Sequence, residues 1–178
     1  MGCDIHVYVE ARGANGKWEC QDKVWKEADG EFRLYAQFGD CARKANPQYN
    51  EPAYRYINRD YILFSVLADV RNGSEDKTPF IDEARGLPED VTPEVKEQSE
   101  SMGEDGHSHS WLLLSEVLAW EGWDRDYSIK DFDDKAIPVL KTKPLREWCW
   151  TFWQKVIPAM KQLRDDPANV RMVFFFDN

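Results

Sequence analysis

The chain has 178 residues, of which 42% are hydrophobic and 13% aromatic, a composition that is typical of a folded protein with one buried core and excludes a disordered chain. Acidic residues number 33 against 23 lysines and arginines, so the formal net charge is −10. A surface of this sign repels phosphate backbones, and the composition therefore disfavours direct binding to nucleic acid.

Hydropathy and cysteine spacing predict a protein of the cytoplasm. No apolar run approaches the roughly 20 residues that a membrane helix requires, and the N-terminus has no basic segment followed by an apolar one. The cysteines at positions 3, 20, 41 and 149 are widely spaced and form no CxxC pair. We therefore expect reduced thiols, no membrane partner and a cytoplasmic location.

The N-terminal residues predict a strand followed by a tight reversal. Apolar and polar residues alternate from Cys3 to Ala11, which is the pattern of a half-buried strand. An Asn-Gly pair at 15–16 favours a turn, after which residues 18–21 return as a second strand. From 22 to 52 the pattern is weak and rich in aromatic and turn residues, so we expect irregular structure with one more short strand.

Two helices are predicted in the middle of the chain. Residues 58–72 carry apolar side chains at helical spacing; Asn58 is suited to cap this helix, and an Asn-Gly pair is suited to end it. Residues 73–106 then form a long excursion. Within it, residues 92–101 begin with Thr, Pro and Glu, which is the pattern of a short exposed helix.

The C-terminal part supplies the remaining elements. Residues 110–114 predict a strand and residues 115–120 a short helix. The longest helix begins near Pro144, and Pro158 is expected to kink or break it. The final residues are apolar on both faces, so we expect the last strand in the middle of the sheet, paired with the first.

Together the elements predict a single globular domain over residues 1–178, with the excursion at about 73–106. Its fold class is α+β, because strands and helices do not alternate regularly along the chain. We expect a mixed or mainly antiparallel sheet with helices packed on one side.

All three histidines lie in two short segments, MGCDIH at the N-terminus and DGHSHSW at 105–111. Residues two apart in a strand share a face, so Asp4 and His6 project side by side, and His107 and His109 do the same if their segment is extended. Two such pairs meeting across a sheet would form a metal site or an acid–base pair. We expect these four and Asp177 to share a site, with solvated surface positions as the alternative.

Arginines near two loops are candidates for anion contacts. Arg71 and Asn72 lie at the C-terminal end of the first predicted helix, and Arg85 precedes Gly86, a residue that lets the backbone approach a ligand closely. The alternative for Arg71 is that it binds the last helix carbonyls, and a structural role is equally open for Arg85. No Gly-rich phosphate loop, GxSxG motif or dinucleotide fingerprint occurs in the sequence, so no catalytic residue is assigned and enzymatic activity is left undecided.

The segments MGCDIH, RDYILFSVLADVRN, RGLP, DGHSHSWL and the terminal FDN together resemble a family of small bacteriophage and prophage proteins. The resemblance covers nearly the whole chain and implies a phage or prophage origin, with the host cytoplasm as the location. Small phage proteins often act against host defence, and one class of them binds or destroys nucleotide immune signals. The resemblance implies such a role by analogy.

Three functions are compatible with these observations. The leading one is a phage-encoded protein that sequesters a nucleotide-derived immune signal, as a homo-oligomer and without a cofactor. Its expected ligand-binding residues are Asp4, His6, Tyr8, Arg71, Asn72, Arg85, His107, His109, Asp177 and Asn178. The first alternative is a metal-dependent phosphohydrolase or phosphodiesterase, whose divalent metal would be bound by Asp4, His6, His107 and His109. The second is an acidic mimic that occupies a partner protein.

Overall fold

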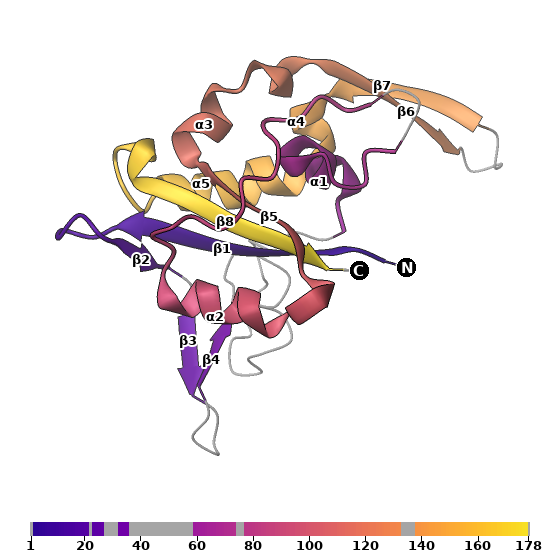
Figure 1. Cartoon of the computed structure of the whole chain (residues 1–178). Coiled ribbons are helices and arrows are strands. Elements are labelled where there is room, and N and C mark those ends of the chain that lie inside the picture. Colours follow the sequence, from indigo (N-terminus) through magenta and orange to yellow (C-terminus); the bar gives the residue numbers. More distant parts are fainter. Residues whose placement is uncertain are drawn as a thin grey trace.

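The computed structural model describes residues 2–21, 23–26, 32–35, 59–73, 77–132 and 138–177, and it has an α+β fold (Figure 1). Its centre is a four-stranded antiparallel sheet with the strand order β2-β1-β8-β5. The four strands are β1 (Asp4–Arg12), β2 (Trp18–Cys20), β5 (His107–Leu113) and β8 (Val170–Asp177). The predicted fold class is therefore confirmed.

The two terminal strands pair along their length. β1 and β8 run antiparallel in a register that sets Asp4 opposite Asp177 and Ala11 opposite Val170. β8 pairs with β5 on its other edge, and every residue from Val170 to Phe176 is buried. The expectation of a central last strand is confirmed, because a strand that is apolar on both faces requires cover on both.

Helices cover both faces of the sheet. One face packs on four helices that lie together on one side in Figure 1, namely α1 (Tyr61–Ala68), α3 (Leu114–Ala119), α4 (Leu145–Trp148) and α5 (Ile157–Lys161). On the opposite side lies α2 (Pro93–Ser101), whose Val95 packs with Tyr8, Val173 and Phe175 in a second apolar cluster. Most of the helices thus occupy one side, as expected. Because α2 covers the other side, His6, Tyr8 and Glu10 on the polar face of β1 are buried, and the expectation of a half-buried first strand is wrong.

The first predicted helix is shorter than its pattern suggested. The N-cap of α1 is Asp60, whose side chain accepts a hydrogen bond from the Leu63 N–H, while Asn58 lies outside the described residues. α1 ends at Ala68, and the left-handed φ of 57° at its C-cap, Asp69, turns the chain so that the Val70 N–H bonds back to the Phe64 carbonyl. The helix therefore stops before the Asn-Gly pair that was expected to end it.

The longest predicted helix is present but divided. α4 is followed by a π-helical segment, Phe152–Val156, and then by α5. Pro158 lies in the first turn of α5 and has no N–H to donate to the preceding turn, so the hydrogen-bond register changes just before it. The predicted interruption is confirmed.

Two hairpins complete the strands. β3 (Lys23–Lys26) pairs with β4 (Phe32–Tyr35), so the described part of the weakly patterned segment already holds two short strands where one was expected. β6 (Asp126–Phe132) and β7 (Pro138–Pro144) form an unexpected hairpin, which projects on the side of α1 and α4 in Figure 1. Short 3-10 helices lie at Gly103–Asp105, Glu121–Asp124 and Pro167–Asn169. Within the described ranges, no helix is long and apolar enough to cross a membrane.

Candidate functional site

The pairing of the terminal strands brings three predicted site residues into contact. The Asp4 N–H donates to Asp177 Oδ1 at 3.1 Å, and His6 Nε2 lies 3.1 Å from Asp177 Oδ2. Arg59, just before α1, forms a two-point ion pair with Asp4, with N···O distances of 2.5 and 2.8 Å. Asp4, His6, Arg59 and Asp177 are called the sheet-end cluster below. Arg59 was not predicted as a site residue, because nothing in its local sequence relates it to a strand 55 residues earlier.

Aromatic stacking extends the sheet-end cluster across three strands. The Phe175 ring stacks with His6 at 5.4 Å between centroids, with His109 at 5.1 Å and with Tyr8 at 5.7 Å. Burial, with a smaller contribution from the charge of His107, lowers the pKa of His109, so its imidazole is neutral at pH 7. Three predicted site residues therefore stack on the ring of Phe175, which lies between His6 and His109.

The two neighbouring histidines of β5 do not share a face. The pairing of β5 with β8 slips between His107 and Ser110, and Ser108 has a left-handed φ of 49°, so the strand contains a bulge. His107 therefore stacks on Phe176 in the larger core, 6.0 Å between centroids, whereas His109 lies on the α2 side. The expectation of side-by-side imidazoles is wrong, because it required an extended backbone at Ser108.

The nitrogen atoms of His107 have different surroundings. Nδ1 lies 3.0 Å from Ser108 Oγ, and Nε2 is buried without a hydrogen-bond partner in the described part of the chain. Within the same ranges, no group of three or more His, Cys, Asp or Glu side chains is arranged to hold a metal ion. The geometry therefore offers no described ligand set for the divalent metal considered above.

Arg71 lies at the same end of the sheet, beside Cys3. Cys3 is fully buried, and this burial raises the pKa of its thiol, although a hydrogen bond and the charge of Arg71 oppose the shift. Arg71 itself is exposed and has a left-handed φ of 59°. Cys3 is thus a small core residue with a protonated thiol, as its strand position suggested. Asn178 lies outside the described residues.

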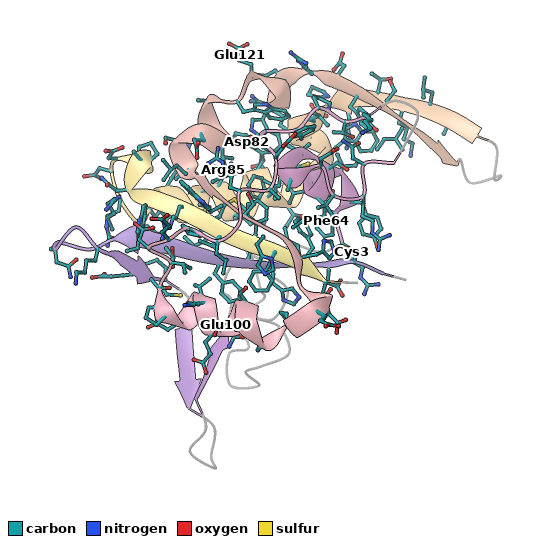
Figure 2. All side chains as sticks on the ribbon, viewed as in Figure 1. Cys3, Phe64, Asp82, Arg85, Glu100 and Glu121 are labelled. Atoms are coloured by element: carbon teal, nitrogen blue, oxygen red, sulfur yellow. The ribbon has the colours of Figure 1, made fainter. Side chains whose placement is uncertain are left out.

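Arg85 is bound by carboxylates of its own chain. Its guanidinium donates to both Glu116 oxygens at 3.0 and 2.9 Å and to Asp82 at 2.8 Å. Asp82 and Arg85 are labelled close together in Figure 2. It also donates to the Trp111 carbonyl at 3.3 Å, and the Gly86 N–H donates to the His109 carbonyl at 2.8 Å. The turn at 85–86 therefore covers the free edge of β5, which is a structural role.

Asn72 is also occupied. Its amide donates to the Thr78 carbonyl at 2.7 Å and to Asp69 at 2.6 Å, and it accepts from the Thr78 N–H at 2.9 Å. Asn72 and Thr78 are both buried. The structure thus places Asn72 and Arg85 outside the sheet-end cluster and gives their polar atoms partners within the chain.

A cavity of about 480 Å³ is formed by residues that the sequence analysis did not select. It lies between the 77–80 segment, the start of β6 and α4, and is lined by Lys77, Thr78, Pro79, Phe80, Arg125, Asp126, Tyr127 and Leu145. The 77–80 segment is more than 40 positions from the other two in the sequence, so no local pattern reveals that they meet. In the following sections this space is called the 77–127 cavity.

The cations of the 77–127 cavity are not paired with carboxylates. Among the described residues, neither the Lys77 ammonium nor the Arg125 guanidinium makes a hydrogen bond or an ion pair, and both side chains are exposed. The sole acidic residue of the lining is Asp126. In a chain of net charge −10, two cations and one carboxylate give the described lining of this cavity a net positive charge.

Comparison with known proteins adds no assignment: no protein-family model, curated protein or solved structure matches this chain. The function proposed below is therefore inferred from the geometry of the chain itself.

Proposed function

We propose that this protein binds a small phosphate-bearing molecule of the nucleotide class in the 77–127 cavity. The observation that carries the proposal is the presence of two unpaired cations, Lys77 and Arg125, at a cavity in a strongly acidic protein. Carboxylates are abundant on this chain, yet none of the described ones pairs with either cation. An anionic ligand would supply the missing partner, since a guanidinium suits phosphate oxygens.

The remaining lining residues suit the other part of a nucleotide. Phe80 and Tyr127 supply aromatic rings, and Pro79 supplies aliphatic surface. Bases stack on aromatic side chains without need of a base-specific contact. The volume of about 480 Å³ falls within the roughly 300–1,000 Å³ of small-molecule pockets. A planar ring joined to a phosphate group therefore fits both the size and the chemistry of the cavity.

We further propose that the ligand is sequestered rather than hydrolysed. The lining combines cations, rings and a hydroxyl group but contains no histidine or cysteine. The phosphohydrolase alternative requires His107 and His109 to face one ion, and the bulge at Ser108 turns them to opposite faces of the sheet. The resemblance to small phage proteins supports a nucleotide-derived immune signal of the host as the sequestered molecule.

Calorimetric titration tests this proposal with inorganic pyrophosphate and a panel of linear and cyclic nucleotides, with and without divalent metal. Lys77→Ala and Arg125→Ala should each weaken binding at least tenfold, because each removes a charge-assisted contact worth about 1.5–3 kcal/mol. Lys161→Ala is the matched control: it removes an equal charge from an exposed position outside the cavity.

The outcomes separate the candidate functions. Recovery of unchanged nucleotide after heat denaturation supports sequestration, whereas metal-dependent turnover would favour the phosphohydrolase. The proposal would be overturned if no member of the panel binds. It would also be overturned if Lys161→Ala weakens binding as much as Lys77→Ala and Arg125→Ala do.

A further inference from the structure

One wall of the 77–127 cavity is tethered to the end of α1. The segment from Lys77 to Phe80 forms this wall, and the next residue, Ile81, donates its N–H to the Val66 carbonyl of α1 at 2.8 Å. At the other end of the segment, Thr78 is bound by the Asn72 side chain. The wall is therefore attached at two points: Ile81 to α1 itself, and Thr78 to the turn that follows α1.

The attachment at Asn72 has the form of a strand pairing. The side-chain carbonyl oxygen accepts from the Thr78 N–H at 2.9 Å, while the side-chain amide donates to the Thr78 carbonyl at 2.7 Å. The same amide nitrogen, Asn72 Nδ2, also donates to Asp69 Oδ1, with an N···O distance of 2.6 Å. An asparagine side chain is the smallest group that offers both a donor and an acceptor in this arrangement.

Burial makes these contacts strong determinants of the wall. Asn72 is 8% exposed and Thr78 is 3% exposed, so the loss of a partner leaves polar groups that water does not readily reach. The turn carrying Asn72 is itself specified by left-handed backbone at Asp69 and Arg71, with φ of 57° and 59°. The backbone turn therefore directs the Asn72 side chain, and this side chain orients Thr78.

We infer that Asn72 is the positioning residue of the 77–127 cavity. By fixing both backbone polar groups of Thr78, it sets where Lys77 and Phe80 stand on either side of that residue. The role of Asn72 in ligand binding rests on the function proposed above. Its effect on the position of the 77–80 wall is independent of that function. Asn72 was expected to contact the ligand itself, and the inference replaces that contact with an action through Thr78.

The test compares Asn72→Asp with the double variant Asp69→Asn/Asn72→Asp. The single substitution keeps the acceptor for the Thr78 N–H but sets a carboxylate oxygen against the Thr78 carbonyl and Asp69, two acceptors that repel it. We expect at least tenfold weaker binding of inorganic pyrophosphate by calorimetry. The double variant supplies a new amide donor at position 69 and should regain part of that affinity.

Amide hydrogen exchange supplies a readout without ligand. In Asn72→Ala the Thr78 amide should exchange at least tenfold faster, while the Phe64 amide, bonded to Asp60 at the start of α1, keeps its rate. An unchanged Thr78 rate overturns the inference whether or not pyrophosphate binds. A third outcome separates the two proposals: wild type and Asn72→Asp bind pyrophosphate equally well, whereas Lys77→Ala does not bind it. In that case positioning by Asn72 is refuted and the proposed function stands. If wild type binds neither pyrophosphate nor any nucleotide of the panel, the proposed function fails, and the exchange rate of the Thr78 amide alone decides whether Asn72 holds the wall.

Discussion

Arginine side chains in the described ranges are largely held by acidic groups of the same chain. Arg59 binds Asp4, and Arg85 binds Glu116 through two parallel hydrogen bonds. The planar guanidinium favours such two-point contacts with any carboxylate or phosphate. The sequence therefore identified Arg85 as an anion-binding side chain, but it did not reveal that the anion is a carboxylate 31 residues later. Arg125 has no such partner among the described residues, and this is why we propose it as a contact for the phosphate group.

His109 gives the stability of the protein a dependence on pH. Burial lowers its pKa below the ordinary value of 6.5, so the unfolded chain takes up a proton at a higher pH than the folded chain does. Its contribution to stability is complete above about pH 6.5 and is lost as the pH falls towards the folded pKa. Wild type should therefore lose more unfolding free energy than His109→Gln between pH 7.5 and pH 5. Urea unfolding at both pH values measures this difference, and equal losses would contradict it.

Strands and helices were predictable wherever a long pattern had a single interpretation. The alternation in β1 and the two-sided apolar pattern of β8 led to their pairing, and the Thr-Pro-Glu start led to α2. The bulge in β5 could not be predicted, because an alternating His-Ser-His-Ser segment looks the same with or without a one-residue slip. The hairpin of β6 and β7 was not predicted either, because polar or charged residues make up half of its two strands and leave no clear apolar face.

Ser108 offers a direct test of this bulge. Its left-handed φ of 49° is strained for a residue with a Cβ and is readily adopted by glycine. We expect Ser108→Gly to keep the unfolding free energy within about 1 kcal/mol of wild type, because relief of strain offsets the lost contact with His107. Ser108→Val should lower it by about 1–3 kcal/mol, since a β-branched residue is disfavoured at this φ. Thermal or urea unfolding measures both, and a Val variant as stable as the Gly variant would argue against the bulge.

At the scale of the whole molecule, a buried ion pair joins the excursion at 73–106 to the sheet. Arg171 of β8 and Glu10 of β1 are 2% and 0% exposed, and Arg171 Nε donates to Glu10 Oε2 at 2.6 Å. The other oxygen of Glu10 accepts from the Thr92 N–H at 2.8 Å, just before α2. Arg171 also donates to Asp90 at 2.6 Å. α2 is therefore fixed by charge as well as by its apolar side, and these long-range partners could not be read from local sequence.

Homo-oligomerisation stays a prediction. Light scattering, which measures the mass of the protein in solution, tests it.

The ion pair of Glu10 and Arg171 should contribute far more to stability than a surface pair does. Glu10→Gln leaves the Arg171 charge buried with less compensation, and we expect it to lower the unfolding free energy by about 3–5 kcal/mol. The matched control is Arg146→Ala, which breaks an exposed pair with Asp124 and should lower it by less than about 1 kcal/mol. Replacing both buried partners, in Glu10→Leu/Arg171→Met, should recover much of the loss because no buried charge is then left alone. Urea unfolding followed by tryptophan fluorescence suits the measurement, since the Arg171 guanidinium lies 4.2 Å from the centre of the Trp18 ring. A loss in Glu10→Gln no larger than in Arg146→Ala would show that the apolar side of α2 is enough to hold it on the sheet.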